Sequence, residues 1–241
     1  GNRNSPAMFN LAWQPVFMWD GGINHIEVMP LAPITNEVEM GEDMLKIASK
    51  LSRNPSYSKR FQRVFGEKPI ESQQIFYALA QYMSMLVSAD AKYDRYRQGK
   101  ESLNADEQDG LQIFRNKCAS CHTEPLFTDF GLRNNGLEVL SDDLGFGRIT
   151  LEEADKYKFK VPSLRNVVLT YPYMHDGRFR TLDQVLDHYS RGMVHHNNLD
   201  PLLITNGQAG ILLTDTDKVK LKAFLHTLSD FTFISNPLFS E

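Results

Sequence analysis

One pentapeptide constrains this chain more than any other feature, and it reads Cys118-Ala119-Ser120-Cys121-His122. Two thiols separated by two residues lie on one side of a helical turn, and a histidine follows the second thiol directly. The C-x-x-C-H pattern is the attachment signature of a c-type haem. The two cysteines would form thioethers with the porphyrin vinyl groups, and His122 would bind the iron as an axial imidazole.

Two other chemistries use a C-x-x-C pair. A zinc site needs two further cysteine or histidine ligands, and the chain has no second C-x-x-C and no H-x-x-x-H. A thioredoxin-like dithiol would follow a strand and open a helix, whereas here a helical run over 106–117 precedes the motif and a loop with Pro125 follows it. Both cysteines belong to the motif, so no structural disulfide is expected. Because haem is attached covalently outside the bacterial cytoplasm, the motif predicts a periplasmic protein.

Length and composition add limits. The 241 residues suggest one large or two modest domains, and a hydrophobic content of 41% is enough for a sizeable core. The net charge of −4 comes without a basic block, so nothing points to nucleic acid. No apolar run approaches the roughly 18–20 residues of a membrane span. The first residues are polar and resemble no signal peptide, while core-type Leu11, Trp13 and Phe17 soon follow, so we expect upstream residues to be missing.

Hydrophobic periodicity indicates a mainly α protein. Apolar residues at steps of three and four predict helices over 36–52, 56–65, 70–88, 106–117 and 182–191, the last capped by Thr181. A final helix opens at Asp215, and its buried stripe is expected to comprise Val219, Leu221, Phe224, Leu225 and Leu228. We expect 1–35 to be loop-rich, 123–181 to be rich in turns, 197–210 to be a loop and 231–241 to be extended. Strand signals are weak.

Several further stretches carry a resemblance to a known family, and they occur in the family's order. In them the chain resembles the bacterial di-haem cytochrome c peroxidases and their MauG relatives over nearly its whole length. The stretches, besides the haem motif, are R-N-S-P at 3–6, F-M-W-D-G-G at 17–22, V-E-M at 38–40, Y-D-R-Y at 93–96, K-V-P-S-L-R-N at 160–166, L-T-Y-P-Y-M-H-D-G at 169–177 and T-L-D at 181–183.

The resemblance implies two cytochrome c-like haem domains. Residues 1–97 would be the remainder of the N-terminal, peroxidatic domain, and residues 98–241 the complete C-terminal, electron-transfer domain. The family's first C-x-x-C-H lies ahead of the R-N-S-P segment, where this chain begins. One haem c is therefore expected on this chain and a second on the missing N-terminal segment.

The resemblance also implies the second axial ligand of the C-terminal haem. The peroxidases use a methionine there, and the MauG-like members place a tyrosine, which corresponds to Tyr189. A phenolate stabilises oxidised iron and would lower the potential, whereas a thioether would raise it. The alternative is that Tyr189 is a packed aromatic and Met193 or Met174 binds the iron. We expect His188, His195 and His196 to lie at the surface.

Two residues match family positions that transfer electrons or protons. Trp19, in its W-D-G context, would relay electrons between the haems, although most tryptophans are simply core residues; Trp13 is expected in the core. Glu39 would take a proton from one peroxide oxygen and deliver it to the other. Alternatively, Glu37 and Glu39 only complement the first turn of a helix. Met29 stands where relatives usually have glutamine, so peroxide positioning would differ.

A calcium ion is the last feature that the resemblance implies, held by the side-chain oxygen of Asn4 and the carbonyls of Thr170 and Pro172. The alternative is an ordinary Asx turn and strand end. His175 is expected to line the region between the domains. The implied activity is reduction of hydrogen peroxide by electrons from a small periplasmic donor of the cytochrome c or cupredoxin type, and dimers occur in the family. A MauG-like oxidation of a partner protein, a non-enzymatic electron carrier and a sensor module are the alternatives.

Overall fold

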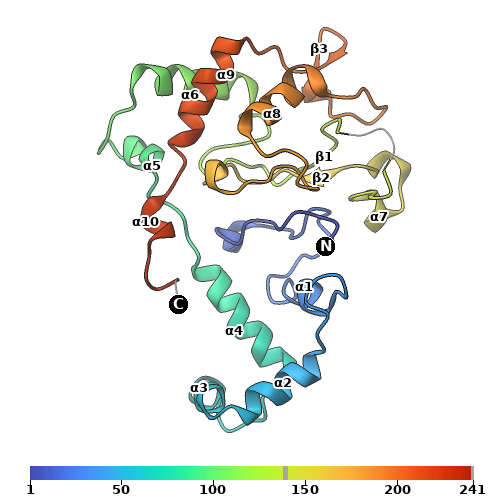
Figure 1. The fold of residues 1–241 in the computed structure, drawn as a ribbon, viewed down its shortest axis with the longest axis vertical. Coiled ribbons are helices and arrows are strands. Elements are labelled where there is room, and N and C mark those ends of the chain that lie inside the picture. Colours follow the sequence, from blue (N-terminus) through green and yellow to red (C-terminus); the bar gives the residue numbers. More distant parts are fainter. Residues whose placement is uncertain (138–140, 240–241) are drawn as a thin grey trace. The chain divides into compact units, whose positions relative to one another are not determined.

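The computed structural model describes residues 1–137 and 141–239 (Figure 1). Within them helices dominate, and the strands form only two short antiparallel pairs, so the predicted mainly α class is confirmed. No helix in these two ranges is long and apolar enough to cross a membrane. In chain order the elements are η1 (Leu11–Trp13), α1 (Leu31–Thr35), α2 (Met44–Arg53), α3 (Pro55–Phe65), α4 (Ser72–Met85), α5 (Lys92–Arg97), α6 (Ala105–Lys117), β1 (Leu132–Arg133), α7 (Gly147–Thr150), η2 (Glu153–Asp155), β2 (Phe159–Lys160), η3 (Val167–Leu169), α8 (Leu182–Asp187), η4 (His188–Gly192), η5 (Pro201–Leu203), β3 (Ile204–Thr205), β4 (Gln208–Ala209), α9 (Asp215–His226) and α10 (Phe231–Ile234).

The chain divides into two compact units. The first comprises Gly1, Met8–Phe17 and Ile23–Leu86, and the second comprises Asn2–Ala7, Met18–Gly22 and Val87–Glu241. Two short N-terminal segments and α5 therefore belong with the C-terminal part of the chain. The haem-domain boundary at residue 97 stays a prediction, because compact units and haem domains are different divisions.

The first unit is built on α2, α3 and α4. The helix predicted over 70–88 is present as α4, in which Ile75 and Met83 are buried; Leu86 follows as a buried C-cap. The predicted helix over 36–52 begins too early, because Gly41 with φ of +57° ends a turn and the Asp43 carboxylate caps α2 by accepting from the Lys46 N–H. Trp13 is 52% exposed rather than in the core, whereas Leu11 and Phe17 are buried as expected.

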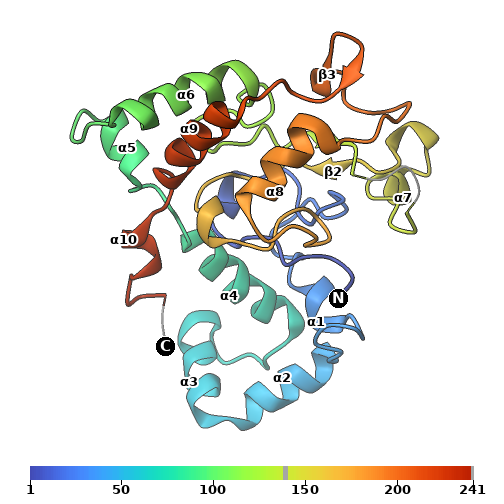
Figure 2. The ribbon, with the colours of Figure 1, turned by 45° about the horizontal axis from the view of Figure 1, so that its top comes forward.

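The core of the second unit lies between α6 and α9, which run side by side in Figure 2. Gly110 allows this approach, since a Cβ there would collide with the Lys220 carbonyl. The predicted buried stripe of the last helix is confirmed at Leu221, Phe224, Leu225 and Leu228. Val219 is the exception: it is 59% exposed, and Lys218 is buried instead. Lys218 donates to Asp187 at 2.6 Å, which compensates its burial. The aromatic and aliphatic core comprises Tyr93, Leu111, Phe114, Phe127, Leu221, Phe224 and Leu228.

Three other predicted segments change form. The helix capped by Thr181 is regular only to Asp187 and continues through η4 as a π-helical turn. The expected loop over 197–210 contains η5 and the β3–β4 pair. The expected extended tail begins with α10, because the Asp230 side chain accepts from the Phe233 N–H and caps it; residues 240–241 lie outside the described ranges.

Candidate haem site

The haem-attachment motif lies where α6 ends. The Cys118 N–H donates to the Phe114 carbonyl at 2.8 Å, and the N–H of His122 donates to the Cys118 carbonyl at 2.9 Å. The motif therefore continues the helix as one more turn, with both cysteines as free, half-buried thiols.

The alternative chemistries of the cysteine pair fit the structure poorly. Burial raises the pKa of Cys118 to about 12 and also raises the pKa of Cys121. Redox dithiols instead hold a thiol pKa low so that the thiolate can attack. Throughout residues 1–137 and 141–239, no group of three or more His, Cys, Asp or Glu side chains is placed to hold a metal ion. The raised thiol pKa values are unlike those of a redox dithiol, and the thioether-forming role of the pair stays a prediction.

His122 is oriented for an axial role by the loop that follows it. Its Nδ1 lies 3.0 Å from the Phe127 carbonyl. A carbonyl only accepts, so Nδ1 carries the hydrogen and Nε2 keeps its lone pair, which is the tautomer that an iron ligand needs. Burial is the largest influence on His122 and lowers its pKa, which favours the neutral ring.

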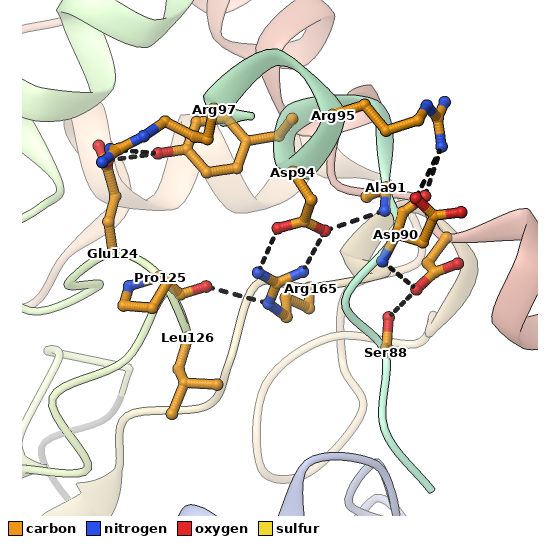
Figure 3. Close-up of polar contacts among 12 residues, drawn as sticks. Ser88, Asp90, Ala91, Asp94, Arg95, Arg97, Glu124, Pro125, Leu126 and Arg165 are labelled. Carbon is orange, nitrogen blue, oxygen red and sulfur yellow. Dashed lines mark hydrogen bonds and ion pairs between the residues drawn. The ribbon is translucent and has the colours of Figure 1, made fainter. Parts of the chain in front are cut away.

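A buried arginine holds this loop in place (Figure 3). The Nε of Arg165 donates to the Pro125 carbonyl at 3.0 Å, and both terminal nitrogens donate to Asp94 at 2.8 and 2.7 Å. Arg165 is only 4% exposed. Ser163 adds a 2.6 Å hydrogen bond to the Leu126 carbonyl. Sequence reasoning gave Arg165 and Asp94 no role, although both stand in stretches that carry the family resemblance.

Glu124 forms a second anchor two residues after the histidine ligand candidate. Its carboxylate accepts from the Tyr93 hydroxyl and pairs with Arg97 at 2.8 Å and Arg115 at 2.9 Å. These charged partners oppose the effect of burial, and the pKa of Glu124 is lowered. The haem motif is thus tied to α5 and α6 on one side and to the segment of Arg165 on the other.

Two of the three candidate distal ligands converge on one amide. The Asn135 Nδ2 donates to the Tyr189 hydroxyl at 3.5 Å and to the Met174 sulfur at 3.6 Å. Burial raises the pKa of Tyr189, and charge on Cys121 or Cys118 would raise it further, which places this hydroxyl near the thiols of the motif. Met193 belongs to an apolar cluster with Leu199 and Leu203, and Tyr189 packs against this cluster.

The π-helical turn explains the orientation of Tyr189. Such turns are rare and frequently occur at functional sites. In η4 the Tyr189 carbonyl accepts from the Ile211 N–H at 2.8 Å. In a regular helix over 182–191, as the sequence predicted, the Tyr189 side chain would point in a different direction. Hydrophobic periodicity alone does not indicate a π turn.

The histidines outside the motif fall into different environments. His188 was expected at the surface, but it is 5% exposed, because its Nε2 contacts the Asn135 carbonyl at 3.0 Å and its ring lies against Phe179. His195 is exposed as expected, and His196 is half-buried with its ring edge-on to Tyr157. His175 is buried and stacks on Phe159 with ring centroids 3.6 Å apart.

Trp19 is held from three directions within the second unit. Its indole Nε1 donates to the Asn4 carbonyl at 2.8 Å, and its own carbonyl accepts from the Lys160 N–H at 2.7 Å. The next residue, Asp20, pairs with Arg3 at 2.6 Å, and Arg3 also pairs with Asp143. The indole is therefore fixed, as a relay residue would need to be, but also as a structural residue would be.

Comparison with known proteins decides the family. Residues 1–102 match the family model described as di-haem cytochrome c peroxidase. The chain is 33% identical over 260 residues to the cytochrome-c peroxidase IdrP2 of Denitromonas iodatirespirans, covering 94% of this chain and 68% of the relative. The chain belongs to the di-haem cytochrome c peroxidase and MauG family. The resemblance seen in the sequence is thereby confirmed.

Further relatives lie on the MauG side of this family. The methylamine utilization protein MauG of Methylorubrum extorquens is 39% identical over 196 residues, which cover 79% of this chain and 55% of the relative. A solved MauG-like protein associated with microbial copper homeostasis superposes with a TM-score of 0.86 at 28% identity and covers all of this chain and 79% of its own. The chain thus spans about half to two thirds of the length of the curated relatives named here. Haem c is the cofactor that the family implies, and the residues around Cys118 and His122 fit it.

The calcium ligands implied by the family are partly brought together. The Asn4 Nδ2 donates to the Pro172 carbonyl at 2.6 Å, and the Asn4 N–H donates to the His175 carbonyl. An amide flip would bring Oδ1, rather than Nδ2, beside the Pro172 oxygen, and calcium binds such oxygen pairs. Thr170 follows η3, two residues before Pro172. The donor types fit a calcium ion, and its binding stays a prediction.

Glu39 lies in the first unit, in the exposed turn between α1 and α2. Its carboxylate accepts from the Asn36 side chain at 2.9 Å. The reading of Glu39 as a residue of a first helical turn is wrong, since α2 begins only at Met44. Met29, at the family's usual glutamine position, is buried. The catalytic role of Glu39 stays a prediction.

Proposed function

We propose that this chain is part of a periplasmic di-haem c-type peroxidase that reduces hydrogen peroxide to water. Each peroxide takes up two electrons and two protons and gives two water molecules. The electrons come from two molecules of a reduced donor of the cytochrome c or cupredoxin type, which are oxidised in turn. One observation carries the proposal: an attachment motif with a correctly oriented histidine and a nearby Tyr189, in a chain 33% identical to a cytochrome-c peroxidase.

Each residue has a stated part in this proposal. Haem c, when bound, supplies one-electron chemistry at its iron. Cys118 and Cys121 would tether it covalently, and His122 and Tyr189 would supply the two ligands of its iron. Trp19 would be the residue that relays electrons between the haem held by 98–241 and the peroxidatic haem of the domain that includes 1–97.

Glu39 and the calcium ligands complete the proposed machinery. The Glu39 carboxylate accepts a proton from one peroxide oxygen and donates it to the other, so that the leaving oxygen departs as water. Asn4, Thr170 and Pro172 would hold calcium through oxygen atoms. Because Asn4 also accepts from the Trp19 indole, calcium would steady the relay residue.

The test combines a haem count with a turnover measurement on the full-length protein. Pyridine haemochrome should give two haems per chain, and one peroxide should oxidise two molecules of a reduced small cytochrome c. One haem and no peroxide reduction would contradict the proposal and favour an electron carrier.

A second candidate function is favoured by the position of Tyr189. A phenolate ligand would lower the potential of the haem at Cys118 and Cys121 and let it hold oxidising equivalents, as in a MauG-like enzyme that oxidises a partner protein. Consumption of peroxide without oxidation of the reduced cytochrome would favour this function over the first.

A further inference from the structure

Asn135 occupies a distinctive position between the two candidate distal ligands. Its Nδ2 is 3.5 Å from the Tyr189 hydroxyl and 3.6 Å from the Met174 sulfur. One amide therefore donates toward both an oxygen and a thioether that could bind the same iron.

The backbone around Asn135 is fixed from two sides. The carbonyl of Asn135 accepts from His188 Nε2 at 3.0 Å, with His188 directly before Tyr189 in the π turn. The buried neighbour Asn134 accepts from the Gly136 N–H at 2.9 Å and donates to Asn198 at 2.7 Å. The segment of Asn135 is thus joined to the π turn through His188 and to Asn198 beyond that turn, and the amide is held toward Tyr189.

The chemistry of the two acceptors differs strongly. An anionic phenolate oxygen is a strong hydrogen-bond acceptor, whereas a thioether sulfur is a weak one. An N–H donor at this place therefore stabilises the phenolate more than the thioether. Groups that bond to metal ligands in this way orient them and tune the metal.

We propose that Asn135 is a positioning residue that selects Tyr189 over Met174 as the iron ligand opposite His122. This inference rests on the proposed function only in assuming haem attachment at Cys118 and Cys121 and ligation by Tyr189. It adds that Met174 could bind the iron in place of Tyr189, and that the uncharged amide of Asn135 disfavours this exchange.

The experiment is done on the full-length holoprotein in the oxidised state. Asn135→Leu removes the donor at similar volume, so a fraction of the haem at Cys118 and Cys121 should become thioether-ligated. That fraction is measured by the far-red charge-transfer absorption of methionine-ligated ferric haem and by a midpoint potential shifted upward. Asn135→Asp places a carboxylate beside the phenolate and should give a larger fraction. The double variant Asn135→Leu/Met174→Leu should lose the absorption, and the exposed control Asn197→Leu should resemble the wild type.

The outcomes separate the inference from the function on which it rests. If Tyr189→Phe changes the spectrum but Asn135→Leu and Asn135→Asp leave spectrum and midpoint unchanged, Asn135 selects nothing and the inference is overturned. If Tyr189→Phe also changes nothing, the ligand assignment itself is wrong. Should Asn135→Leu fail to fold, Asn135→Ala is measured in the same way, and an unchanged spectrum there overturns the inference equally.

Discussion

The two compact units hold their candidate functional residues in different ways. In the second unit Arg165, Asn135 and Trp19 each have hydrogen bonds to separate segments of the chain. In the first unit Glu39 lies in an exposed turn, and both its carboxylate and its N–H bond to Asn36, only three residues away. A site held by long-range contacts depends on the fold of its whole unit, whereas a residue in an exposed turn can be changed with little effect on stability.

The largest effect is expected at the haem motif. Cys118→Ala combined with Cys121→Ala should abolish covalent haem attachment to this chain, because no other cysteine is present to form a thioether. On the full-length protein, for which we expect two haems, a pyridine haemochrome count should fall from two haems to one in the double variant. Ser120→Ala, between the two cysteines, is the matched control and should keep both haems; a count of two in the double variant would refute attachment here.

The contrast between the units is next tested at Glu39. Glu39→Gln removes the acid and base while keeping the side chain's size, so peroxide turnover should fall by about 10²–10⁴-fold. Because Glu39 is exposed, thermal unfolding should stay unchanged. Glu37→Gln, two residues away in the same turn, should reduce turnover little. Equal turnover in the wild type and Glu39→Gln would exclude Glu39 as the acid and base.

Removing Arg165, in contrast to Glu39→Gln, should lower the stability of the protein. Arg165→Leu leaves the Asp94 carboxylate buried without its partner, which costs about 3–5 kcal/mol. Chemical unfolding of the second unit, followed by haem absorption, measures the change. Lys222→Gln is the matched control, because its pair with Asp183 is largely exposed and such pairs contribute about 0–1 kcal/mol. Similar losses in the two variants would show that the ion pair does not hold the loop of Pro125.

These differences also explain what the sequence revealed and what it did not. The haem motif, the mainly α class and the cap at Thr181 could be predicted because each depends on neighbouring residues. The burial of His188 and Lys218 could not be predicted, because the polar partner of each lies far along the chain. His188 contacts the Asn135 carbonyl, and Lys218 donates to Asp187. The π turn of Tyr189 likewise depends on Ile211, which no local pattern could indicate.

The smallest expected effect tests whether the two units unfold separately. Asn54 caps α3 in the first unit and Thr214 caps α9 in the second, each through a side-chain oxygen. Asn54→Ala and Thr214→Ala should each cost about 1 kcal/mol. Only Thr214→Ala should shift the unfolding midpoint seen by the haem at Cys118 and Cys121, because α9 packs directly on α6, which carries that motif. Far-ultraviolet circular dichroism should detect both losses. If Asn54→Ala shifts the haem-monitored midpoint equally, the two units unfold as one cooperative body. The units would then differ in the local contacts of their candidate residues but not in their stability.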